Sequence, residues 1–117
     1  EELESVCKRV VGVAGNMDRE SVRKKYPVKV LLELEGFKVG IIHGWGARAL
    51  LTEAIKDAFK GDNPDIIIFG HSHQSMNKRL GEILFFNPGS ATDAAADYSS
   101  YGIIEIGTKI DARIIKI

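Results

Sequence analysis

Two histidines that are two residues apart follow an apolar run, in the segment Gly70-His71-Ser72-His73. In an extended backbone the side chains of residues i and i+2 point to the same side, with Cα atoms roughly 6.5 Å apart. That distance is too long for both imidazoles to bind one ion easily, but it suits two ions about 3.5–4 Å apart that each take one imidazole. The spacing therefore indicates half of a two-metal hydrolytic site. Two solvated loop histidines remain the alternative interpretation.

Further candidate ligands follow two earlier predicted strands. Asn16 comes after the apolar run 9–14, and His43 comes after the run 37–42. The carboxyl ends of strands in an open sheet converge, so we expect both side chains to approach the histidine pair. Imidazole and amide oxygen are acceptable ligands to manganese, iron, nickel, cobalt and zinc. A lone asparagine after a strand is usually a turn residue, but the combination favours a metal site.

The hydrophobic pattern predicts the strands that must position these residues. Alternating or continuous apolar runs, separated by glycine, proline and asparagine, are typical of strands and hairpins. The expected strands are 9–14, 28–35, 37–42, 65–69, 76–80, 83–86, 101–106 and 110–117, with turns at 87–90 and loop at 91–100. Residues 1–8 are expected to be a helix end, and residues 20–26 a helical turn.

One amphipathic helix is expected over residues 47–60. Its apolar positions form a single stripe at helical spacing, and Gly61 is a plausible stop. The stripe consists of Leu50, Leu51, Ala54, Ile55, Ala58 and Phe59. A helix among several hairpins predicts a domain that contains a mixed sheet.

Size and composition restrict the function classes. The chain has 117 residues, which suits one domain, and its 16 basic and 16 acidic side chains cancel. Without a basic face, nucleic acid is an unlikely partner except as a substrate. No apolar run is long enough to span a membrane, so a membrane partner is not expected. The lone Cys7 excludes an intrachain disulfide and favours a cytoplasmic location.

Four motifs taken together resemble those of the calcineurin-like metallophosphoesterases. In order they are Gly15-Asn16-Met17-Asp18, His43-Gly44, Gly70-His71-Ser72-His73 and Phe86-Asn87-Pro88-Gly89-Ser90. Within this family the four motifs are most similar to those of the small prokaryotic phosphodiesterases. The resemblance covers essentially the whole chain. The resemblance implies an α/β (α+β) fold, in which a sandwich of two mixed β-sheets is flanked by helices and two divalent metal ions lie at the sheet ends.

The resemblance also assigns the ligands. Asn16, His43 and His71 would bind one ion and His73 the other, with manganese favoured and nickel, zinc, iron or cobalt as alternatives. A hydroxide held between the ions would attack phosphorus in line with the leaving oxygen. The implied activity is hydrolysis of a small-molecule phosphoester, most plausibly a phosphodiester. These four residues are therefore the candidate catalytic set.

Residues around the ligands have supporting roles in this comparison. Asp18 would orient a ligand, although a simple cap on the following turn is an equally good interpretation. Gly70 and Ser72 would shape the histidine loop. The segment 87–90 would lie beside the site and orient a histidine through backbone carbonyls, without a catalytic role.

The sequence departs from the family in its acidic ligands. The family begins with an Asp-x-His strand and a Gly-Asp segment that supply carboxylates to both ions. No Asp-x-His occurs here, and Gly61-Asp62 comes too late in the chain and lies before Pro64. We therefore expect residues 1–117 to be the C-terminal two-thirds of the family fold, lacking roughly 40–60 residues of a strand-helix-strand-helix start. Neutral ligands alone compensate poorly for the desolvation of a dication, so the chain alone is expected to bind metal weakly and hydrolyse little.

A second class of function also fits the same fold. A fold can be retained when its catalytic activity is lost. The eukaryotic retromer subunit of this superfamily resembles such a case, a non-catalytic scaffold for protein interactions. The four coordinating residue types favour an enzyme over this alternative. The isoleucine-rich segment 101–117 could form an interface, so a homo-oligomer is a further expectation.

Overall fold

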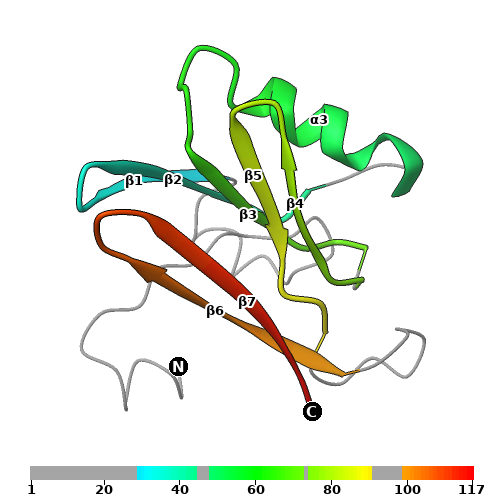
Figure 1. Cartoon of the computed structure of the whole chain (residues 1–117). Coiled ribbons are helices and arrows are strands. Elements are labelled where there is room, and N and C mark those ends of the chain that lie inside the picture. Colours follow the sequence, from blue (N-terminus) through cyan, green and yellow to red (C-terminus); the bar gives the residue numbers. More distant parts are fainter. Residues whose placement is uncertain (1–28, 45–47, 73, 91–98) are drawn as a thin grey trace, which may run out of the picture.

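A computed structural model describes residues 29–44, 48–72, 74–90 and 99–117. Within these ranges the chain forms seven strands, one α-helix and one short 3-10 helix. Figure 1 shows how the strands and the α-helix are arranged. The strands are β1 (Lys29–Leu34), β2 (Phe37–Ile42), β3 (Ile66–Phe69), β4 (Met76–Leu80), β5 (Ile83–Asn87), β6 (Ser100–Ile106) and β7 (Ile110–Lys116). The elements predicted before residue 28 lie outside the described residues. The predicted α+β class with a mixed sheet is confirmed.

The main sheet has three parallel strands at its centre. Its order is β1-β2-β3-β5-β4, in which β2, β3 and β5 run parallel while β1 and β4 are antiparallel edge strands. The register places Ile42 opposite Phe69 and Ile68 opposite Phe86. The three central strands therefore end at the same edge of the sheet, and the loops that follow them meet there.

A side chain fixes where the central pairing begins. The Asp65 carboxylate accepts a hydrogen bond from the backbone N–H of Lys38 at 2.8 Å. The Asp65 N–H donates to the Lys38 carbonyl at 2.8 Å, and the Asp65 carbonyl accepts from the N–H of Leu84 at 3.0 Å. Asp65 thus joins β2, β3 and β5 at their starts, which sets the register that carries through to their ends.

The helix α3 (Leu51–Ala58) covers one face of this sheet. Its inward side chains belong to a buried cluster made of Ile42, Leu51, Ile55, Phe59, Ile67, Phe69 and Phe85. Gly40 allows the close approach, because a Cβ at this position would lie 2.9 Å from the Phe59 ring. None of the helices that the structure describes combines the length and the apolar character needed to cross a membrane.

The predicted helix was too long at both ends. A 3-10 helix, Arg48–Leu50, precedes α3, and the α-helix ends at Ala58 rather than at residue 60. Leu50, predicted to lie in the apolar stripe, is 61% exposed. The tighter 3-10 winding changes the angle per residue from that of an α-helix, so the positions before Leu51 leave the stripe.

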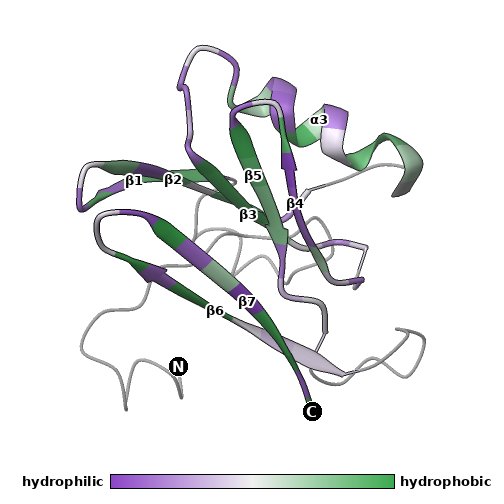
Figure 2. Cartoon of the chain, viewed as in Figure 1, coloured by the Kyte–Doolittle hydropathy of each residue, from purple (hydrophilic) through white to green (hydrophobic). Residues whose placement is uncertain are grey.

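The hairpin of β6 and β7 covers the opposite face. Figure 2 shows apolar residues along both strands, and the inward ones pack on a second cluster that includes Val39, Ile66, Leu84 and Phe86. Gly102 lies directly against this layer, since a Cβ there would be 2.5 Å from the Phe86 ring and 3.1 Å from Pro88. The two sheets form the predicted sandwich, although the second sheet is an antiparallel pair in the described part of the chain.

Candidate functional site

The structure brings two of the four predicted ligands together. His43 follows β2 and His71 follows β3, and their ring centroids lie 5.5 Å apart with an interplanar angle of 76°. A hydrogen bond from the Gly70 N–H to the His43 carbonyl, at 3.0 Å, continues the parallel pairing into these loops. Both histidines are half-buried. Asn16, Asp18 and His73 lie outside the described residues.

The separation of the two rings is compatible with one shared ion. For nitrogens about 2.1 Å from an ion and bond angles of roughly 90–120°, two imidazole centroids are about 4.5–5.5 Å apart. The observed 5.5 Å falls at the upper end of that range. Edge-to-face aromatic contacts have similar separations, so the distance admits a metal site without requiring one.

The orientation of His43 leaves one ring nitrogen for a ligand. Its Nδ1 lies 3.1 Å from the Gly44 carbonyl oxygen. A carbonyl can only accept, so Nδ1 must carry the proton and donate, and the lone pair is then on Nε2. Histidines that bind metals commonly donate their other N–H to a backbone carbonyl in this way. The donor set of His43 therefore fits a metal ligand.

His71 occupies a strained backbone conformation. Its φ is +69°, and the Ser72 N–H donates to the Gly70 carbonyl at 2.9 Å, which defines a γ-turn centred on His71. Such turns are rare and persist where the surrounding structure enforces them. His71 therefore does not have the extended conformation for which the spacing of residues i and i+2 was considered.

A buried amide holds this turn in place. Asn87 at the end of β5 is fully buried, and its Nδ2 donates to the Gly70 carbonyl and to the Ser72 hydroxyl, each at 3.2 Å. Its Oδ1 accepts from the Gly89 N–H at 2.9 Å. The sequence predicts Asn87 in a turn, whereas the structure includes it in β5. Its side chain contacts the residues on both sides of His71, and the orientation of a histidine by backbone carbonyls of 87–90 stays a prediction.

Gly44 packs between the two histidines and α3. Its φ is +96°, and a Cβ there would lie 2.7 Å from Leu51 Cδ1 and 3.5 Å from His71 Cβ. The absence of a side chain therefore lets the loop after β2 approach both the helix and the His71 loop.

We expect Gly44→Ala to lower the free energy of unfolding by more than about 1 kcal/mol, because alanine is strained at positive φ and also collides with Leu51. Gly61→Ala is the matched control, since Gly61 has φ +88° but open space around it. Urea denaturation of both variants separates strain from collision. Equal losses in the two variants would contradict the packing described at Gly44.

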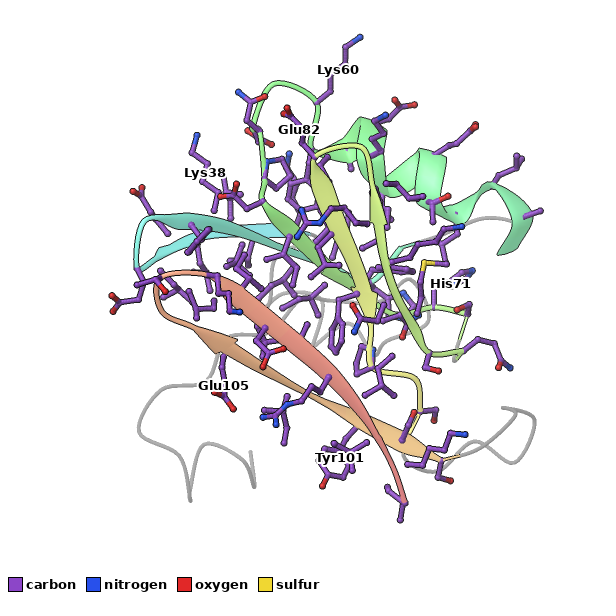
Figure 3. All side chains as sticks on the ribbon, in the orientation of Figure 1. Lys38, Lys60, His71, Glu82, Tyr101 and Glu105 are labelled. Atoms are coloured by element: carbon purple, nitrogen blue, oxygen red, sulfur yellow. The ribbon has the colours of Figure 1, made fainter. Side chains whose placement is uncertain are left out.

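Among the described residues, no acidic side chains join the two histidines in a cluster that could bind a metal ion. No group of three or more histidine, cysteine, aspartate or glutamate side chains is placed to hold a metal ion within the ranges that the structure describes. Figure 3 shows His71 at one end of the sheet, far from the labelled Lys38, Lys60 and Glu82 at the other. Within the described residues, the two imidazoles are therefore part of a site that has no third ligand of these types.

Comparison with known proteins identifies the family. The profile of the calcineurin-like phosphoesterase superfamily domain matches residues 1–109. The chain therefore belongs to this superfamily, and the resemblance seen in its four motifs is confirmed.

Individual relatives are consistent with this assignment. A Methanothermobacter thermautotrophicus protein named probable metallophosphoesterase is 35% identical over 98% of this chain. The Escherichia coli phosphodiesterase YfcE is 29% identical over 90% of the chain. The chain spans 66% of the first relative and 57% of the second.

A solved structure supports the fold. Vps29 from Entamoeba histolytica, determined as a complex with zinc, superimposes with a TM-score of 0.71 at 25% identity, covering 97% of this chain and 72% of that one. The sandwich of the described residues is therefore the fold of the metallophosphoesterases.

Proposed function

We propose that this chain supplies the histidine-bearing side of the metal centre in a metal-dependent phosphodiesterase. The observation that carries the proposal is the meeting of His43 and His71 at the ends of two parallel strands, with ring centroids 5.5 Å apart. Two loops distant in sequence present imidazoles to one place, which is the arrangement expected of a metal site. Family membership supports the same conclusion independently.

Different residues of the chain would bind each of two divalent ions. His43 and His71 would bind one ion together with Asn16, and His73 would bind the other. Bound divalent ions activate water and neutralise charge on phosphoryl oxygens. The fixed tautomer of His43 would direct Nε2 to its ion, and the γ-turn would hold the His71 ring beside it. Asp18, Gly70 and Ser72 would support these ligands.

A phosphodiester is the substrate class that we favour. One relative is named a phosphodiesterase and another a probable metallophosphoesterase. In the resemblance to the family, Met17 takes the position at which many phosphatases of the superfamily have a histidine that protonates the leaving group. Without that proton donor, diesters with acidic leaving groups should react best. Manganese is the ion that we propose, and nickel, zinc, iron or cobalt are alternatives, because imidazole and amide oxygen form a permissive ligand set.

The test is hydrolysis of a bis-aryl phosphodiester by the protein in its full natural length. We expect turnover that requires added Mn²⁺, disappears with a chelator, and returns when Mn²⁺ is restored. The corresponding aryl phosphomonoester is the matched substrate control and should react more slowly. Turnover that is unaffected by metal removal would refute the proposal. Tight Mn²⁺ binding without hydrolysis of either substrate would instead favour a scaffold on the same fold.

A further inference from the structure

We infer that Asn87 is the positioning residue for His71, acting through the γ-turn rather than by contact with metal or substrate. This inference rests on the proposed function, because it concerns how one of the proposed ligands is held. Asn87 is fully buried and lies on β5, the strand that pairs with β3. It is therefore part of the rigid sheet, whereas His71 belongs to the loop that the sheet must position.

The hydrogen-bond partners fix the orientation of the Asn87 amide. The Gly70 carbonyl can only accept and the Gly89 N–H can only donate, so Nδ2 must face Gly70 and Oδ1 must face Gly89. If the amide were flipped, Oδ1 would face the Gly70 carbonyl oxygen, acceptor against acceptor, and Nδ2 would face the Gly89 N–H, donor against donor. The side chain therefore has one satisfied orientation, and no buried side-chain polar atom among the described residues is left without a partner.

The two Nδ2 bonds hold both ends of the γ-turn. One bond reaches the carbonyl of Gly70, just before His71, and the other reaches the hydroxyl of Ser72, just after it. Gly70 also donates to the His43 carbonyl. A single amide thus fixes the residues that flank His71 and, through Gly70, the relation of the His71 loop to the His43 loop.

The other side of the amide is anchored as well. Oδ1 accepts from Gly89, and the neighbouring Pro88 carbonyl accepts a 2.7 Å hydrogen bond from the hydroxyl of Ser100, a buried residue at the start of β6. The segment 87–89 is therefore tied to the second sheet. Asn87 links the His71 loop to both layers of the sandwich, which gives the strained turn the external support that it needs.

Asparagine alone among similarly sized residues meets these demands. Aspartate keeps the acceptor for Gly89 but has no N–H for Gly70 and Ser72, and leucine keeps the volume but has neither donor nor acceptor. In both variants the Gly70 carbonyl loses its bond from residue 87. Leucine also loses the bond to Ser72, whereas aspartate can accept from the Ser72 hydroxyl, so Asn87→Leu is the more severe change. The His71 ring should then lose its fixed place beside the His43 ring, even where the protein stays folded.

The experiment compares Asn87→Asp and Asn87→Leu with Leu84→Ala in the protein of full natural length. Leu84 is buried on the same strand but belongs to the second core cluster, so Leu84→Ala controls for a general loss of stability. Ser72→Ala, which removes one of the two Nδ2 acceptors, is the milder variant if the Asn87 variants do not fold. Measurements are made where circular dichroism shows each variant fully folded.

Two readouts decide the inference. In the metal-free protein, the NMR signals of the His71 ring should shift in the Asn87 and Ser72 variants, and the Ser72 amide signal should shift in the Asn87 variants. Both sets of signals should stay in place in Leu84→Ala. In a Co²⁺ titration followed by visible absorption, the affinity should fall about 10–100-fold in the Asn87 variants, the range for partners of metal ligands, and change less than about twofold in the control.

The inference and the proposed function fail in different ways. Unchanged His71 and Ser72 signals in the folded variants, or equal effects of Leu84→Ala, would overturn the positioning role whatever the metal does. Absence of Co²⁺ binding by the unsubstituted protein would overturn the proposed function, while the metal-free NMR comparison would still decide the role of Asn87.

Discussion

Replacing His71 by alanine is expected to weaken Mn²⁺ binding by more than about a hundredfold and to reduce phosphodiester turnover at least as much. Loss of an outer partner of a metal ligand already lowers affinity about 10–100-fold, and removal of the ligand itself should exceed that. His43→Ala should have a similar effect. Because both rings would serve one ion, the double variant should be little worse than either single variant.

Isothermal titration with Mn²⁺ and a bis-aryl phosphodiester assay, both on the protein of full natural length, check this result. Lys60→Ala is the control, since Lys60 is exposed and lies at the opposite end of the sheet from His71 (Figure 3). It should change neither measurement. Additive losses in the double variant would mean that the two histidines act at separate sites, and an unaffected His71→Ala would remove this residue from the proposed ligands.

The second large effect is expected at Gly102, where the two sheets touch. Its hypothetical Cβ would lie 2.5 Å from the Phe86 ring, and Phe86 is 1% exposed, so the ring has no room to withdraw. Overpacking of this kind typically costs about 1–3 kcal/mol, and we expect Gly102→Ala to fall at about 2–3 kcal/mol. In a domain of this size the melting temperature should drop by roughly 6–18 °C.

Gly107→Ala is the matched control for this measurement, because nothing lies within 4 Å of a Cβ at Gly107. Thermal denaturation followed by circular dichroism should show a change of less than about 0.5 kcal/mol in the control. A similar small change in Gly102→Ala would show that the hairpin of β6 and β7 does not pack against Phe86 as described.

The sequence was sufficient to predict the strands of the sandwich. The continuous apolar run that became β3 is buried on both faces, and the alternating run that became β1 is half-exposed. Whether alternate or successive side chains are buried is directly visible in the spacing of apolar residues along the sequence. The hairpins, with Gly36 and Gly81 at positive φ in their turns, were predictable for the same reason.

The start of the helix could not be predicted from the pattern. Leu50 fits the helical stripe by its spacing, yet it is exposed because the preceding turn is a 3-10 helix. Whether a first turn winds as α or 3-10 depends on what the loop before it contacts. Local spacing contains no information about those contacts.

The candidate site was predictable in its residue types but not in its geometry. His43 and His71 were expected to converge because their strands end together. The γ-turn at His71, with φ +69°, was not expected, since positive φ is uncommon for residues other than glycine. The turn depends on Asn87, which is 17 residues from Gly70 in the chain. The only signal was an asparagine directly after a fully apolar run.

The parallel arrangement of β2, β3 and β5 has a consequence for the order of folding. Parallel neighbours cannot be joined by a tight hairpin, so each pairing closes a longer loop. Such long-range contacts form slowly and late compared with the local hairpins of β1–β2 and β4–β5. His43, His71 and Asn87 stand at the ends of these three strands. During folding the two imidazoles therefore meet only once the parallel strands β2 and β3 have paired.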